Sequence, residues 1–210
     1  MRCRHLLLGL AATILGTFAF CASSAARRLS RRRSGSVASS TLILMADSRR
    51  PQQAAASVQA IGYWSLAAAL NLRYACSQGY DFAFFELVRS GSNAGVEKNA
   101  SLCSHSRHGP RASPWCKLVA VAEVLSSDQY ETVVFIDSDA FFNTGISIEQ
   151  LLKEYGVDEQ QKSTASLFLP SNKPFADYRA NTGLQIWRNT PRARQVLQRW
   201  WDADTHAFEH

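Results

Sequence analysis

The most informative part of the chain is Glu131-Thr-Val-Val-Phe-Ile-Asp-Ser-Asp-Ala-Phe-Phe142, an apolar run that ends in two carboxylates one residue apart. Residues 133–136 are four consecutive apolar residues, a pattern typical of a strand covered on both faces. Asp137 and Asp139 come just after its carboxyl end, and open α/β sheets bind ligands at that edge. The pattern therefore predicts a buried central strand that leads into a ligand site.

The two aspartates favour a metal site over an ordinary turn. Most Asp-x-Asp sequences are turns with a solvated charge, because Asp is common in turns. Here the flanking residues 133–136 and 140–142 are apolar, so two acids between them are costly unless something compensates their charge. A hard divalent cation that also binds phosphate oxygens would do so, with Ser138 either turned away or offering its hydroxyl.

The charge of the chain is concentrated at its beginning. Residues 1–50 contain nine arginines and one acid, whereas the remaining 160 residues contain 14 basic and 16 acidic side chains. The body is therefore slightly acidic, which argues against a nucleic-acid partner. A length of 210 residues suits one domain preceded by a targeting segment.

The first 40 residues have the composition of a targeting segment. Residues 1–26 are predicted to be a signal anchor or a cleaved signal peptide, and 27–40 a basic, Ser-rich stem. A signal anchor would place the chain in the secretory pathway as a single-pass type II membrane protein. The arginines of the stem and the absence of acids before Asp47 keep an organelle transit peptide open. The sequon at Asn99 predicts glycosylation and fits a luminal body.

The body alternates between strand-like and helix-like segments, which predicts an α/β fold with a mostly parallel sheet. A loop is expected over 89–109, and the capping signals are Ser113-Pro114, Ser147 with Gln150, and Thr190-Pro191. The expected strands are 41–46, 81–88, 133–136, 165–169 and 183–187, and the expected helices are about 61–78, 114–125, 148–155 and 191–201.

The cysteines and histidines of the body predict no metal site. Cys103 and Cys116 either bridge the loop or stay apart, and together with Cys76 they make an odd number, which leaves at least one thiol unpaired within the body. His105 and His108 are expected to be solvated loop residues.

Several of these segments together resemble the GT-A nucleotide-sugar glycosyltransferases. The similar group contains fungal α-galactosyltransferases, mannan-polymerase subunits and plant xyloglucan xylosyltransferases, and the resemblance spans about residues 41–201. The residues that carry it are Tyr63-Trp64, Asn71, Tyr74-Ala75, Gly79-Tyr80-Asp81, Trp115-Cys-Lys117, Phe135-Ile-Asp-Ser-Asp-Ala140, Asn181-Thr-Gly183 and Arg188-Asn189.

The resemblance implies a GT-A, Rossmann-like domain over 41–210 that transfers a hexose or pentose from a nucleotide-sugar donor to a glycan acceptor. In that reading Asp139 ligates Mn²⁺ or Mg²⁺, and Asp137 contacts the metal or the ribose. The remaining implied contacts are Ala46, Asp47 and Ser48 with the nucleoside, Lys117 and Ser138 with the sugar nucleotide, and Asn181, Thr182 and Gly183 with the donor sugar or acceptor. No catalytic base or nucleophile is predicted.

The resembled family has a further segment beyond its last helix, so the resemblance predicts a domain that is truncated at its C-terminus. This leaves a second reading: a non-catalytic subunit that binds a glycan or sugar nucleotide within a complex of transferases. A third reading is a phosphohydrolase of the haloacid dehalogenase type, in which the first Asp would be the nucleophile. Secreted and plastid-targeted forms remain alternatives to Golgi anchoring.

Overall fold

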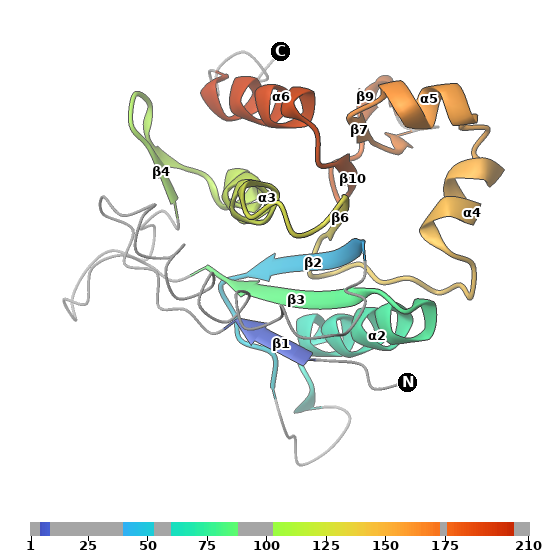
Figure 1. Ribbon diagram of the computed structural model, residues 1–210. Coiled ribbons are helices and arrows are strands. Elements are labelled where there is room, and N and C mark those ends of the chain that lie inside the picture. Colours follow the sequence, from blue (N-terminus) through green and yellow to red (C-terminus); the bar gives the residue numbers. More distant parts are fainter. Residues whose placement is uncertain (1–4, 9–39, 53–59, 88–102, 173–175, 204–210) are drawn as a thin grey trace, which may run out of the picture.

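The computed structural model describes residues 5–8, 40–52, 60–87, 103–172 and 176–203. Within them the chain forms a six-stranded sheet of order β1-β3-β2-β6-β10-β7, with helices on both faces (Figure 1). The neighbours β1, β3, β2 and β6 are parallel, whereas β10 is antiparallel to β6 and β7 is antiparallel to β10. The strands are β1 (His5–Leu8), β2 (Thr41–Asp47), β3 (Asp81–Glu86), β6 (Thr132–Ile136), β7 (Leu167–Phe168) and β10 (Leu184–Arg188). The expected α/β class with a mostly parallel sheet is confirmed.

The central strands are buried on both faces, which is why they read as continuous apolar runs. Leu42 and Leu44 of β2 belong to a core layer with helices α3 (Cys116–Ser126) and α6 (Pro191–Asp202). Ile43 and Met45 face the opposite way, onto α2 (Tyr63–Gln78) and α4 (Ile148–Glu154). Figure 1 shows α2 on one side of the sheet and α3 with α6 on the other.

Two of the capping signals give the expected structure. Ser147 and Gln150 form a reciprocal capping box at the start of α4, and the Thr190 side chain accepts from the backbone N–H of Ala193 in α6. The prediction for Ser113 is wrong, because the first turn there is the 3₁₀ helix η2 (Ser113–Trp115), which begins after Ala112 and has no side-chain cap.

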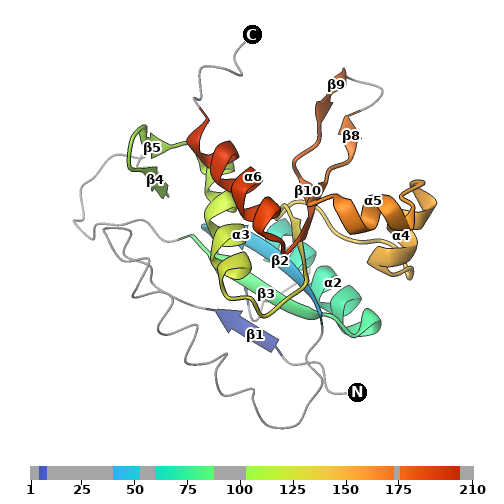
Figure 2. The same cartoon turned by 45° about the horizontal axis from the view of Figure 1, so that its top comes forward.

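The structure contains short elements that the sequence did not predict. The expected loop 89–109 ends in a hairpin of β4 (Cys103–His105) and β5 (Gly109–Arg111). A second hairpin, β8 (Ser171–Asn172) with β9 (Ala176–Ala180), follows helix α5 (Glu159–Thr164) and projects away from the sheet (Figure 2). Three of these four strands have only two or three residues, which is too short to show a periodic pattern, and β9 has five.

The first hairpin is tied to the body by a disulfide. Cys103 in β4 bonds Cys116 at the start of α3, which settles the question that the spacing left open. Cys76 is disulfide-bonded as well, so the expectation of an unpaired thiol is wrong.

The same hairpin holds the end of α6. His105 is only 5% exposed, and its Nε2 lies 2.8 Å from Oδ1 of Asp202. Its Nδ1 accepts from two backbone N–H groups of the hairpin, so the expectation of a solvated His105 is wrong. Buried Arg111 donates 2.8 Å hydrogen bonds to the carbonyls of Trp201 and Ala203, where a cation also complements the carboxyl end of a helix.

The predicted targeting segment is only partly described. Residues 5–8 form β1 beside β3, and the rest of 1–39 and all of 88–102, with Asn99, lie outside the described residues. None of the described helices has the length and apolar composition needed to cross a bilayer. The anchor, the stem, the glycosylation site and the domain boundaries therefore stay predictions.

Replacing Leu44 by Ala should lower the free energy of unfolding by about 2–5 kcal/mol, because it leaves a cavity in a fully buried layer. The matched control is Leu66→Ala on α2, where the side chain is 49% exposed and a change within about 0.5 kcal/mol is expected. Urea denaturation of the two variants measures both, and equal losses would contradict the assignment of the core.

Candidate active site

The topology of the sheet brings three segments together at one edge. Strands β2 and β6 are parallel, so their carboxyl ends, with Asp47 and Asp137, reach the same edge. Strand β10 is antiparallel to β6, so its beginning lies there too, with Leu184 opposite Ile136. The N–H of Asp137 donates a 2.8 Å hydrogen bond to the carbonyl of Gly183. Residues 181–183, distant in sequence, are thereby placed beside the Asp-Ser-Asp segment.

Lys117 joins this edge to helix α3. Its ammonium donates to Oδ1 and Oδ2 of Asp137 at 2.8 and 3.2 Å and to the carbonyl of Thr182 at 3.1 Å. Lys117 is 9% exposed, and its Nζ lies 5.4 Å from the centre of the Phe135 ring. The predicted site residues Lys117, Asp137 and Thr182 therefore form one connected group.

The turn 181–183 is held by its own polar groups. The side chain of Gln185, fully buried, donates to the carbonyl of Thr182 at 3.0 Å, and Oδ1 of Asn181 accepts from the N–H of Gly183 at 2.8 Å. A Cβ at Gly183 would stand 3.2 Å from Oδ2 of Asp137. Glycine at this position therefore permits the close approach of the turn to the carboxylate.

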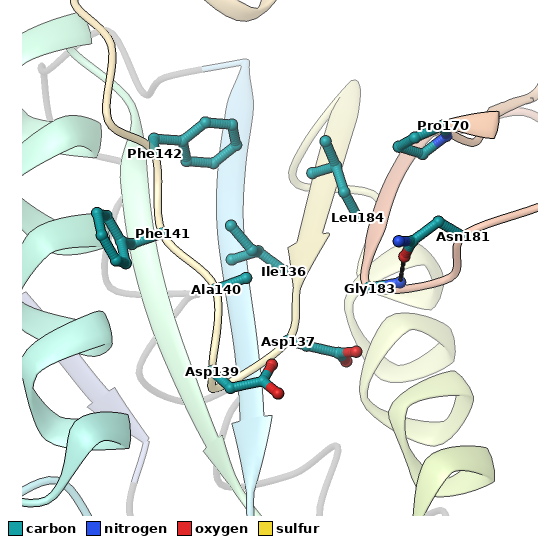
Figure 3. Close-up of a pocket in the computed structure, with 10 residues that line it drawn as sticks. All are labelled: Ile136, Asp137, Asp139, Ala140, Phe141, Phe142, Pro170, Asn181, Gly183 and Leu184. Atoms are coloured by element: carbon teal, nitrogen blue, oxygen red, sulfur yellow. Dashed lines mark hydrogen bonds between the residues drawn. The ribbon is translucent and has the colours of Figure 1, made fainter. Parts of the chain in front are cut away.

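Asp139 has a different environment from Asp137. It is exposed, and within the described part of the chain it takes part in no hydrogen bond or ion pair. Figure 3 shows its carboxylate on the same side of the strand end as that of Asp137. Both border a pocket of about 450 Å³, whose other lining residues are Ile136, Ala140, Phe141, Phe142, Pro170, Asn181, Gly183 and Leu184. The pocket thus combines one free carboxylate with an apolar wall.

Asp47 is engaged with protein groups. Its carboxylate accepts from the Nε and Nη2 of Arg49 at 2.9 and 2.6 Å and from the hydroxyl of Ser138. Burial raises the pKa of Asp47, but the hydrogen bonds from Arg49 and Ser138 outweigh this effect, so the pKa lies below its usual value. The predicted pair Asp47 and Ser138 is in direct contact, and it links the ends of β2 and β6.

Arg49 is a residue of this site that the sequence interpretation missed. Its guanidinium lies 4.5 Å from the ring centre of Trp64 and 4.9 Å from that of Tyr63, and it donates to the Tyr63 hydroxyl at 2.8 Å. The indole of Trp64 in turn donates to the carbonyl of Arg50. Arg49 therefore joins the end of β2 to the start of α2, and an arginine two residues after a strand-end aspartate was the available signal.

Asn71 holds the segment that follows Asp139. Asn71 is fully buried in α2, where its Nδ2 donates to the carbonyl of Ala140 at 2.9 Å and its Oδ1 accepts from the N–H of Phe142 at 3.0 Å. Tyr74, one turn further on, stacks on Phe142 with ring centres 4.3 Å apart. Asn71 is one of the residues that carry the family resemblance, but no role was predicted for it. A lone amide among the alanines and leucines of a helix was the signal.

The predicted nucleoside contacts Ala46 and Ser48 lie next to this hydrogen-bonded group of side chains. Ala46 is partly buried in β2 and packs against the core, and Ser48 is exposed just beyond the strand.

Among the described residues no group of three or more Asp, Glu, His or Cys side chains could hold a metal. Asp139, with Asp137 beside it, still fits an ion of the Mg²⁺ or Mn²⁺ type, because such ions bind through one or two carboxylates and complete their shell with phosphate and water.

Comparison with known proteins supports the fold. No protein-family model and no curated protein matches the chain. Among solved structures, it is similar to a glycosyltransferase described as involved in the glycosylation of the major capsid of PBCV-1, with a TM-score of 0.50 and 15% identity over 81% of this chain and 71% of that one. The chain therefore shares the α/β fold of that structure, and the resemblance to a glycosyltransferase family stays a prediction.

Replacing Asp47 by Asn should destabilise the protein by about 2 kcal/mol at neutral pH, since hydrogen bonds to a buried charge are lost. The pKa of Asp47 is lower in the folded than in the unfolded state, so its contribution exists above the unfolded pKa and disappears as the pH falls through the folded pKa. The difference in unfolding free energy between the wild type and Asp47→Asn should therefore shrink below about pH 4.

The control for this pH series is Glu131→Gln, because Glu131 is exposed and its replacement should change stability little at any pH. Urea denaturation at several pH values measures both variants. A difference for Asp47→Asn that stays constant down to pH 3 would contradict the lowered pKa.

Proposed function

We propose that this protein is a metal-dependent glycosyltransferase that moves a hexose or pentose from a nucleotide-sugar donor to a glycan acceptor. The observation that carries the proposal is Asp139, a carboxylate exposed in a pocket at the carboxyl edge of a mostly parallel sheet. Open α/β sheets bind ligands at this edge. The glycosyltransferase fold of the similar structure supports the same reading.

In this proposal Asp139 is the main protein ligand of Mn²⁺ or Mg²⁺. When bound, the ion would act as a Lewis acid that stabilises the charge developing on the departing nucleoside diphosphate. The protein's part is to hold the carboxylate at a fixed place, and it does so through Asn71, which binds the main chain on both sides of Phe141. The fixed geometry matters because preorganised groups need no rearrangement during reaction.

The turn 181–183 forms the opposite side of the pocket from Phe141 and Phe142 and would meet the donor sugar or the acceptor. Asn181 is exposed there, and its amide nitrogen makes no hydrogen bond within the described residues, because the contact to Gly183 uses Oδ1. The apolar wall suits the less polar face of a sugar ring, while water is displaced from the carboxylates.

The nucleoside would lie toward the first βα loop. Both oxygens of Asp47 are already engaged by Arg49 and Ser138, so Asp47 would order the loop and Ser48, which is exposed, would be the nearer contact. Anchoring in the Golgi membrane, glycosylation at Asn99 and assembly with other transferases remain parts of the proposal that come from the sequence.

A non-catalytic binding subunit is the second candidate. The observation that favours it is the pocket lining, in which Asp137 and Asp139 are the titratable side chains. Asp137 is already paired with Lys117, so the described residues of the lining offer no separate group to take a proton from an acceptor. Such a subunit would bind a donor without transferring its sugar.

Calorimetric titration with UDP, GDP and their common sugar conjugates, with and without Mn²⁺, tests the proposal. Asp139→Ala is expected to reduce metal-dependent nucleotide binding at least about tenfold, because it removes a ligand charge from the ion. Glu154→Gln, an exposed acid of α4, should bind as the wild type does. A folded wild type that binds no nucleotide with Mn²⁺ would refute the donor site.

The same protein, mixed with a bound donor and a panel of oligosaccharides, separates the two candidates. Transfer of the sugar, detected by mass spectrometry of the acceptor, supports the enzyme. Tight donor binding without transfer to any acceptor supports the binding subunit.

A further inference from the structure

The ammonium of Lys117 is fully committed within the protein. An ammonium has three N–H donors, and Lys117 has three acceptors within 3.2 Å: both oxygens of Asp137 and the carbonyl of Thr182. To contact a phosphate, Lys117 would have to give up one of these. Its present arrangement is therefore better suited to neutralising Asp137 than to receiving a diphosphate.

This pairing makes Asp137 a poorer ligand for a cation than Asp139. Asp137 has an ammonium at both oxygens, whereas Asp139 is exposed and has no partner within the described residues. A divalent ion that reaches the protein alone thus meets one free carboxylate and a fixed positive charge nearby. Affinity for such ions is lower when fewer negatively charged ligands are available.

Lys117 is also held firmly in place. The residue before it, Cys116, is fully buried and disulfide-bonded to Cys103. Its third acceptor, the carbonyl of Thr182, is fixed by a second donor, the buried amide of Gln185. The lysine is therefore a preorganised part of the site and not a mobile surface charge.

We propose that Lys117 keeps Asp137 from serving as a metal ligand, so that the site takes up a divalent ion together with a nucleoside diphosphate and binds the ion alone only weakly. This inference rests on the proposed function. The diphosphate supplies the anionic oxygens that Asp137 does not, and Asp139 supplies the protein's carboxylate. Lys117 acts through Asp137 and is a positioning residue.

The alternative role for Lys117, direct contact with the phosphates, predicts the opposite result for the ion alone. If Lys117 served only to bind phosphate, its removal would weaken nucleotide binding and leave Mn²⁺ binding without nucleotide unchanged. If it neutralises Asp137, its removal frees a second carboxylate and strengthens Mn²⁺ binding. The ion without nucleotide is therefore the decisive probe.

The experiment measures Mn²⁺ binding to the full chain in the absence of nucleotide, from the loss of the electron paramagnetic resonance signal of free Mn²⁺. Lys117→Met is expected to bind Mn²⁺ on the order of tenfold more tightly than the wild type, the factor for removing one unit charge near a divalent ion in a solvent-exposed site. Lys117→Arg, which keeps the charge, should stay close to the wild type.

Two further variants make the result specific. The double variant Lys117→Met with Asp137→Asn should lose the gain, because the freed carboxylate is no longer present. Lys153→Met removes an exposed lysine of α4 and should leave Mn²⁺ binding unchanged. Circular dichroism establishes that each variant is folded, and Lys117→Gln, which keeps an N–H donor, replaces Lys117→Met if that variant does not fold.

Equal or weaker Mn²⁺ binding by the folded Lys117 variant would overturn the inference, as would a gain that survives in the double variant. This outcome is distinct from failure of the proposed function. That failure would appear as a wild type that binds neither UDP nor GDP when Mn²⁺ is present, whatever Lys117→Met does with the ion alone.

Discussion

The burial of the central strands on both faces is the constraint on which the rest of the structure depends. Strands β2 and β6 lie between two apolar layers, one with α3 and α6 and the other with α2 and α4. No polar side chain can be accommodated along their length without a partner. The chain can therefore place charged groups only where these strands end, and parallel pairing puts those ends at one edge. The position of the site follows from this burial.

At that edge most charges are neutralised by the protein itself. Asp47 is paired with Arg49, and Asp137 is paired with Lys117. In each pair the basic side chain donates to both carboxylate oxygens. Asp139 differs from both because it is exposed and unpaired within the described residues. Among the described residues of the site, Asp139 is thus the carboxylate available to a ligand, and two ion pairs lie beside it.

The support for this carboxylate comes largely from buried amides. Asn71 binds the backbone just after Asp139, and Gln185 binds the turn that approaches Asp137. Both are fully buried, and in such positions a polar group is retained only when its hydrogen bonds are made. Each amide fixes a stretch of irregular backbone that is not held by the regular backbone hydrogen bonds of a helix or sheet.

The sequence by itself determined the α/β class, the main strands and helices, and the place of Asp137 and Asp139 at a strand end. These follow from local apolar periodicity and capping chemistry, which act between residues close in the chain. It also predicted Lys117 and the turn 181–183 as site residues, though only through a resemblance.

Only the tertiary structure decided that Lys117 is paired with Asp137, that Asp47 is joined to Ser138, and that His105 is buried against Asp202. These contacts join residues that are up to 97 positions apart, or they depend on the direction of a strand such as β10. The local pattern of β10 does not show which way the strand runs, because a strand buried on both faces has the same apolar run in either direction. The pairing of charges at the site is therefore a property of the assembled sheet.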